Sequence, residues 1–173
     1  MNPRFRKFLS YYRPHVKIFS LDMGCVLVAA GVSLALPLVS RYITKQLTGD
    51  MPAAALSQVL WAGGGMLALI LLYTVCNMAY GYQGHLMGVK METAMRSELF
   101  AHYERLSFSF YDGQKVGRLM SILSNDVLSM TELYHHAPED ILMFLVKFVG
   151  AFVLLLNINL PLTLAAFSLL PLM

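Results

Sequence analysis

Hydrophobic positions gather in three long stretches of the chain that contain no Asp, Glu, Lys or Arg: residues 23–40, 51–89 and 148–173. A helix needs about 20 mostly apolar residues to cross the hydrocarbon core of a bilayer. The pattern therefore predicts an all-α membrane protein with long helices. We expect its spans near residues 21–43, 59–80 and 138–157.

Asn157, Asn159 and Pro161 break the apolar run and together predict a tight turn, and a fourth apolar segment covers residues 160–173. Its fourteen residues would form about 21 Å of helix, less than the ~30 Å of the hydrocarbon core. We therefore expect an incomplete fourth span. This segment favours a sequence that is the N-terminal part of a longer protein, or a truncated gene product.

The segment between the second and third spans, residues 81–137, is more polar but has helical periodicity. Apolar residues recur at i, i+3 and i+4 from Leu119 to Tyr134. Glu92 and Arg96 are spaced to form an i,i+4 ion pair on a helix. We predict a hairpin of two helices that continue well past the bilayer and are joined at the tip by a short crosswise element.

Charge decides the orientation of these helices. Only 13% of the residues are charged, against roughly 25% in soluble proteins, and 57% are hydrophobic, which opposes a disordered chain or a soluble enzyme. Lys and Arg concentrate before the first span and within residues 81–137. The positive-inside rule therefore predicts a cytoplasmic N-terminus and a cytoplasmic hairpin.

The basic segment of residues 1–17 contains Tyr11 and Tyr12, which is typical of an interfacial helix along the inner leaflet. Nucleic-acid binding is the competing interpretation of these charges. We expect no nucleic-acid partner, because the orientation of the first span already explains the basic residues.

Two features of the predicted spans are candidates for specific roles. Lys147 is the one formal charge within residues 141–156, the apolar core of the third span. It lines a cavity and meets an anionic substrate, or it extends to the headgroups, or it pairs with an acidic residue on another helix. The Gly84-x-x-x-Gly88 spacing favours close packing of helices over a role in substrate binding.

The sequence contains no recognisable metal-binding pattern. Cys25 and Cys76 lie in apolar runs without a zinc-type spacing, which indicates buried reduced thiols. His135 and His136 are adjacent and would project about 100° apart on a helix, which makes them a poor pair of ligands. We therefore predict no metal site.

The stretch Phe110–Val127, FYDGQKVGRLMSILSNDV, resembles the first intracellular loop of ABC exporters, and Leu160–Leu172 resembles the entry to their fourth transmembrane helix. One departure is Ile122, where that family commonly has Arg. The resemblance implies that residues 18–173 are part of a six-helix transmembrane domain in the cell (inner) membrane. It also implies a nucleotide-binding domain, on the same or a separate chain, and a second transporter half in a homodimer or heterodimer.

In ABC exporters, the tip of this loop is a coupling helix that packs on the nucleotide-binding domains. By resemblance, the coupling helix lies near residues 111–119. Apolar contacts would come from Tyr111, Val116 and Leu119, and the full set of expected contact residues is Tyr111, Asp112, Gln114, Lys115, Val116, Arg118 and Leu119. The alternative interpretation is a turn that only caps the hairpin, because Gly and Asp clusters mark turns in general.

No Gly-Lys pair occurs in the sequence, so the phosphate-binding loop of an ATP site is missing. We predict no catalytic residue and no cofactor in this chain. ATP and Mg²⁺ would bind to the nucleotide-binding domain, and the whole transporter would hydrolyse ATP. The alternative function is a small membrane protein that regulates or scaffolds a partner without transporting anything.

Overall fold

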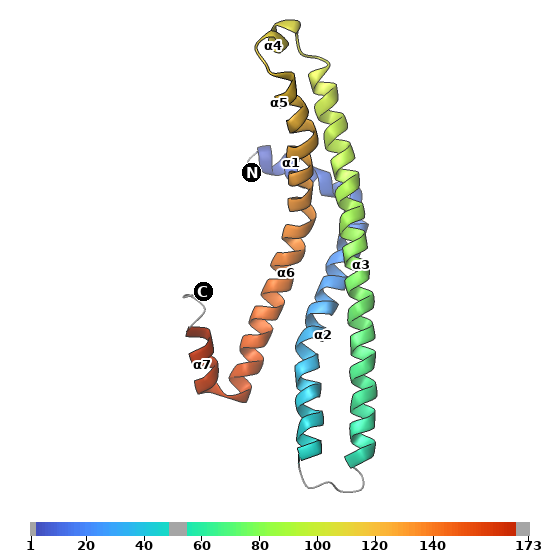
Figure 1. The fold of residues 1–173 in the computed structure, drawn as a ribbon, viewed down its shortest axis with the longest axis vertical. Helices are drawn as coiled ribbons and strands as arrows, with labels where there is room; N and C mark the ends of the chain where they lie inside the picture. The colour runs from blue at the N-terminus through green and yellow to red at the C-terminus, as the bar shows by residue number, and fades with distance from the viewer. Residues whose placement is uncertain (1–2, 49–54, 169–173) are drawn as a thin grey trace. The chain divides into compact units, whose positions relative to one another are not determined.

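The computed structural model describes residues 3–48 and 55–168, which contain helices and no strand. In chain order they form α1 (Pro3–Tyr12), a 3₁₀ turn η1 (Arg13–His15), α2 (Val16–Thr48), α3 (Ala55–Tyr103), α4 (Phe108–Asp112), α5 (Val116–Ser121), a π-helical turn η2 (Ile122–Asp126), α6 (Val127–Ile158) and α7 (Leu160–Ser168), as Figure 1 shows.

Three helical stretches are long and apolar enough to cross a membrane: Arg6–Thr48, Leu56–Tyr103 and Val116–Ile158. Each contains one of the three spans expected from the sequence. The prediction of an all-α membrane protein with long helices is therefore confirmed. The expected fourth segment begins as α7, and its residues 169–173 lie outside the described part of the chain.

The chain divides into two compact units. The first, which we call the hairpin unit, combines residues 1–23 with residues 79–140. The second, which we call the apolar unit, combines residues 24–78 with residues 141–173. The two units are described separately below.

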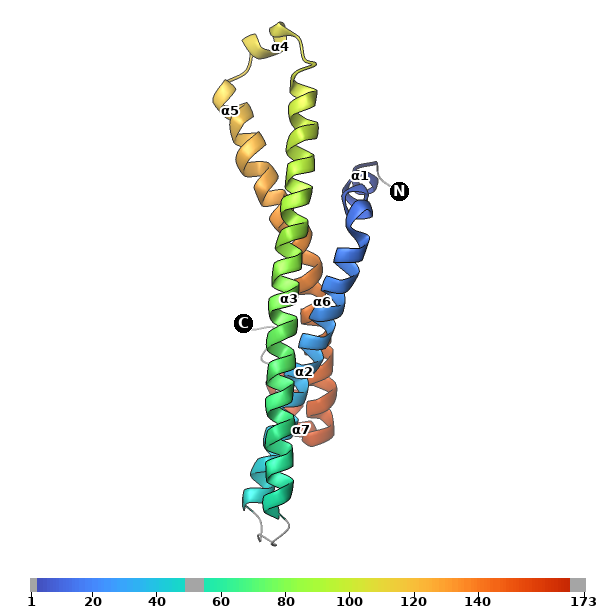
Figure 2. The same cartoon turned by 90° about the vertical axis from the view of Figure 1, so that its right-hand side faces the viewer.

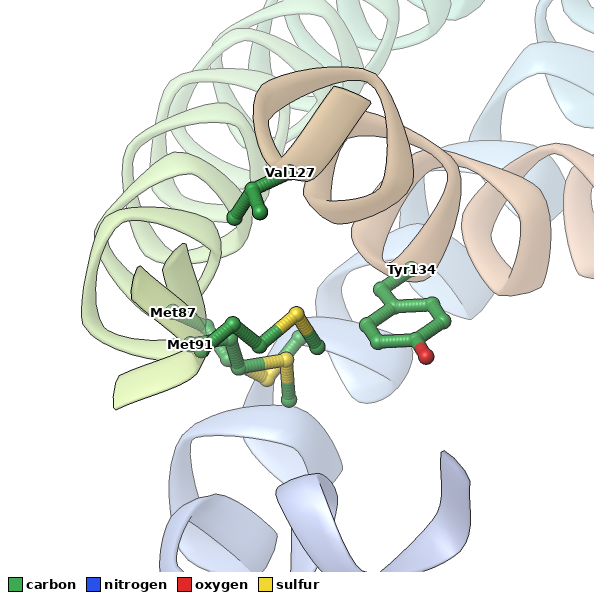
Figure 3. Packing of buried hydrophobic residues seen from close by; sticks show 5 residues of the cluster. Met87, Met91, Val127 and Tyr134 are labelled. Carbon is green, nitrogen blue, oxygen red and sulfur yellow. The ribbon is translucent and has the colours of Figure 1, made fainter. Parts of the chain in front are cut away.

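The core of the hairpin unit is a cluster rich in methionine. Its buried members are Met87, Met91 and Met95 of α3, together with Val127 and Tyr134 of α6. The four-residue spacing of the methionines places them on one face of α3, and Figure 3 shows Met87 and Met91 pointing toward the side of Tyr134. Flexible thioether side chains fill irregular gaps well, so this core joins the two arms of the hairpin.

Helix α1 packs on this hairpin. The ammonium of Lys7 pairs with the Glu98 carboxylate, and the Tyr11 hydroxyl donates a hydrogen bond to Glu98 Oε2 at 2.7 Å. The Tyr12 hydroxyl donates to the Tyr134 carbonyl oxygen at 2.5 Å. An interfacial helix was expected here from the sequence, and these contacts show that its aromatic side chains are engaged by protein.

These contacts shift the acidity of the groups that make them. Hydrogen bonds from Lys7 and Tyr11 hold the pKa of the Glu98 carboxyl below its usual range. Burial raises the pKa of Tyr12 to about 12, with a smaller contribution from Tyr134. The Tyr12 phenol therefore keeps its proton, and with it its role as donor, throughout the physiological range of pH.

We expect Tyr12→Phe to lower the stability of the full-length protein by about 0.5–1.5 kcal/mol, because the Tyr134 carbonyl oxygen loses its hydroxyl donor. Thermal unfolding in detergent measures the change. Tyr82→Phe is the matched control, since the Tyr82 ring is exposed in the same unit. Equal unfolding midpoints for the two variants would contradict the prediction.

Close approach of helices also occurs in the apolar unit. A Cβ added at Gly150 of α6 would clash with Leu34 Cδ1 of α2. The Phe167 ring of α7 packs edge-on against Phe148 and Phe152 of α6, with ring centroids 5.4 and 4.7 Å away. Small residues and aromatic edges thus set the packing of these apolar helices.

Candidate functional site

The tip of the hairpin is built from two short helices between the end of α3 and the start of α6, as Figures 1 and 2 show. The sequence predicted one crosswise element near residues 111–119. The structure instead has α4 and α5, separated by Gly113, Gln114 and Lys115. The break at these residues turns the chain from α4 into the returning arm.

Tyr111 fastens the tip to the end of α3. Its hydroxyl donates a hydrogen bond of 2.6 Å to the carbonyl oxygen of Tyr103, the last residue of that helix. The final carbonyl groups of a helix have no partner within the helix, so a side-chain donor at this place stabilises the helix end. The Tyr111 ring is half-buried, which matches this anchoring position.

The structure places most of the other expected coupling residues on the surface of the tip. The side chains of Asp112, Gln114, Lys115, Val116 and Arg118 are exposed. Leu119, by contrast, is only 8% exposed and is turned inward. Its apolar side chain is therefore packed within the hairpin.

Phe108 is the residue of the tip that the sequence analysis missed. It begins α4, and 91% of it is exposed. An aromatic side chain this exposed, at the end of the hairpin, is free to contact a partner. A sequence signal is present, since Phe108 is an apolar residue between two serines, just before the Phe110–Val127 stretch.

An arginine connects the two arms below the tip. Arg96 forms the i,i+4 ion pair with Glu92 that the sequence predicted, at 2.6 Å, and this pair is confirmed. Arg96 Nη2 also donates to the Ser124 carbonyl oxygen at 3.1 Å. Ser124 lies in the π-helical turn η2, so this hydrogen bond joins α3 to the returning arm.

A second group of polar side chains lies where α2, α3 and α6 meet within the hairpin unit. We call it the polar node and define it by Asp22, His85, His135, His136 and Glu139. Asp22, His135 and Glu139 are each at most 5% exposed. Apart from a side-chain hydrogen bond between Asp22 and Glu139, the Asp22 carboxyl oxygens and Glu139 Oε1 have no hydrogen-bond partner among the described residues. Burying such polar groups costs free energy, which distinguishes the polar node from the apolar packing around it.

The two glycines expected to pack helices line this node. A Cβ added at Gly84 would clash with Glu139 Oε1, and one added at Gly88 would lie 2.9 Å from His135 Nδ1. The structure thus places His135 and Glu139 of α6 directly against the glycine face of α3. The sequence pattern indicated packing but could not name these partners.

The three histidines of the node gather closely. The ring centroids of His135 and His136 are 4.1 Å apart, and that of His85 lies 4.9 Å from His135. His135 Nδ1 donates to the Thr131 carbonyl oxygen at 2.8 Å. Burial lowers the pKa of His135, so its ring is neutral at physiological pH. The sequence analysis compared only the adjacent pair and did not include His85.

Lys147 lies on α6 in the apolar unit, where it is half-buried. Within residues 3–48 and 55–168 it has no ion-pair partner. Phe144 lies three residues before Lys147 and Phe148 directly after it, and their rings stack with centroids 5.3 Å apart.

Comparison with known proteins gives a consistent result. Residues 19–173 match the family described as the ABC transporter transmembrane region. The chain is 36% identical over 166 residues to the uncharacterized ABC transporter ATP-binding protein YwjA of Bacillus subtilis, covering 96% of this chain and 28% of that protein. It is 28% identical to YknV of the same organism, named in the same way, over 96% of this chain and 28% of that protein.

A further relative is the ATP-dependent lipid A-core flippase of Syntrophus aciditrophicus. It is 29% identical over 129 residues, which cover 73% of this chain and 20% of the flippase. The chain thus spans less than a third of the length of these relatives. Its three apolar helices and the match over nearly its whole length show that it belongs to the ABC transporter transmembrane family.

Proposed function

We propose that this chain forms part of the membrane domain of an ATP-driven exporter in the cell (inner) membrane, and that its hairpin tip docks on a nucleotide-binding domain. The exposed Phe108 ring is the observation that carries the proposal. The N-terminus and the tip then face the cytoplasm, in agreement with the distribution of Lys and Arg. The relatives named as ATP-binding proteins support a nucleotide-binding domain as partner.

The surface of the tip suits such a docking contact. Phe108 and Val116 supply exposed apolar area, and Lys115 and Arg118 supply charge beside it. Aromatic anchors inside a polar rim are typical of protein interfaces. The alternative, a turn that only caps the hairpin, would leave this exposed apolar area without a partner.

The arms below the tip are suited to transmit motion. The methionine cluster and the Arg96–Ser124 hydrogen bond join the two arms, so a push on the tip moves them together. We propose that ATP, bound with Mg²⁺ by the nucleotide-binding domains, drives their closure and that the hairpin passes this movement to the spans. A second transporter half completes the substrate pathway, which Lys147 helps to line.

A substitution at the charged rim tests the proposal in the full-length protein reconstituted in nanodiscs. We expect Lys115→Ala/Arg118→Ala to retain ATP hydrolysis while its coupling to the spans weakens severalfold, because the rim contacts are lost. The readout is the reactivity of Lys147→Cys toward a maleimide. It should change on trapping with ATP and vanadate, and should change much less in the double variant.

Lys90→Ala is the matched control, since Lys90 is an exposed cation on the same hairpin but twenty-five residues before Lys115. It should leave the response of Lys147→Cys as in the parent protein. A full response to vanadate trapping in Lys115→Ala/Arg118→Ala would count against docking through this rim. A small membrane protein that only regulates or scaffolds a partner would show no ATP-dependent response in any variant.

A further inference from the structure

The geometry points to a binding site for a divalent transition metal ion, held by His85 of α3 and by His135 and His136 of α6. These are three of the five histidines of the chain, and their ligand nitrogens lie within 4.8 Å of one another. Nitrogens bound to one tetrahedral zinc ion are about 3.4 Å apart. Side-chain rotation of the exposed His85 and the half-buried His136 closes the remaining distance.

His135 is the anchor of the site. Its Nδ1–H is donated to the Thr131 carbonyl oxygen, so the lone pair of the neutral ring lies on Nε2. Nε2 is buried and has no hydrogen-bond partner among the described residues, in a side chain that is 2% exposed. A histidine that binds a metal through one nitrogen usually donates its other N–H to a carbonyl or carboxylate. His135 has this arrangement: its Nδ1–H is donated to a carbonyl oxygen and its Nε2 is available to a metal ion.

Negative groups surround the three rings. Glu132 Oε2 lies 3.3 Å from His136 Nε2 and 3.9 Å from His135 Nε2, where it can supply a fourth ligand. Glu139 Oε2 lies 3.7 Å from His136 Nδ1. The carboxyl groups of Asp22 and Glu139, which are buried and hydrogen-bonded to each other, lie next to these histidines.

The donor set selects the class of ion. Imidazole nitrogens suit Zn²⁺, Cu²⁺, Ni²⁺ and Fe²⁺, whereas Mg²⁺ and Ca²⁺ prefer sites made of oxygen ligands. Adjacent histidines alone are a poor pair, as the sequence analysis argued, and the contribution of His85 from the facing helix is what completes the set. The ion would tie α3 to α6 beside Gly84 and Gly88. This inference does not depend on the transport proposal.

Metal titration of the full-length protein tests the site. The protein is purified without a polyhistidine tag and stripped with a chelator. Zn²⁺ is then titrated in competition with a chromophoric chelator, and Co²⁺ is titrated while its visible absorption is recorded. We expect His85→Gln and His136→Gln each to lower the affinity of one Zn²⁺ per chain by more than about tenfold. Both should also weaken the Co²⁺ bands of tetrahedral coordination.

His102→Gln is the matched control, because His102 is an exposed histidine on the same helix as His85 and outside the group. It should bind Zn²⁺ as the wild-type protein does. Zn²⁺ should also raise the thermal unfolding midpoint of the wild type and of His102→Gln, but not that of His85→Gln, which tests the site in a variant altered only at an exposed position. Wild-type affinity for Zn²⁺ in His85→Gln and His136→Gln, or no Zn²⁺ binding by the wild type, would overturn the inference.

Discussion

Replacing Gly88 by leucine should destabilise the full-length protein by about 2–4 kcal/mol relative to Gly81→Leu. A Cβ at position 88 already lies 2.9 Å from His135 Nδ1 and 3.1 Å from Cε1 of the same ring. The ring cannot move aside cheaply, because it is buried and its Nδ1 is bound to the Thr131 carbonyl oxygen. Overpacking and loss of this hydrogen bond therefore add together.

Gly81→Leu is the matched control for this effect. Gly81 lies on α3 seven residues before Gly88, and a Cβ added at Gly81 would meet no atom within 4 Å. Both substitutions gain the same helix propensity, about 1 kcal/mol, so that gain cancels in the comparison. Thermal unfolding in detergent provides the measurement. Similar unfolding midpoints for the two variants would show that the glycine face does not hold α6.

The long helices could be predicted from the sequence because they depend on properties read along one segment. Bilayer thickness alone fixes the length of an apolar span, and the i,i+4 spacing alone brings Glu92 to Arg96. Neither prediction requires knowing which other segment of the chain packs against the helix. The same holds for the family resemblance, which rests on the contiguous stretch from residue 110 to residue 127.

The polar node could not be predicted because it depends on contacts between distant segments. His85 and His135 are fifty residues apart in the chain, and only the register of α3 against α6 brings their rings within 5 Å. Tyr11 and Glu98 meet in the same way. Periodicity assigns a residue to a helix face but does not say which residue of another helix faces it.

The tip shows a third limit. Val116 and Leu119 are both apolar and three residues apart, yet the first is exposed and the second is buried. A pattern of apolar residues therefore could not separate the contact surface for a partner from the packing within the hairpin, and Phe108 was missed for the same reason.

Phe108→Asp should abolish most of the ATP-driven response of the membrane spans in the full-length protein. Burying a phenylalanine side chain at an interface is worth about 1.5–3 kcal/mol, and a carboxylate in its place adds a desolvation cost. A loss of about 3 kcal/mol corresponds to a more than hundredfold weaker contact. The maleimide reactivity of Lys147→Cys should then no longer change on trapping with ATP and vanadate, while folding is kept, because the Phe108 ring makes little contact within the hairpin.

Ser109→Asp is the control, since it introduces the same charge one residue later at another exposed position of α4 and leaves the Phe108 ring in place. It should reduce the vanadate response far less than Phe108→Asp. If the two variants respond alike, charge alone disturbs the tip and the aromatic ring is not the anchor. If Phe108→Asp responds as the wild type does, force reaches the spans by a route other than α4. The contrast between neighbouring positions thus separates an aromatic anchor from a general sensitivity of the hairpin.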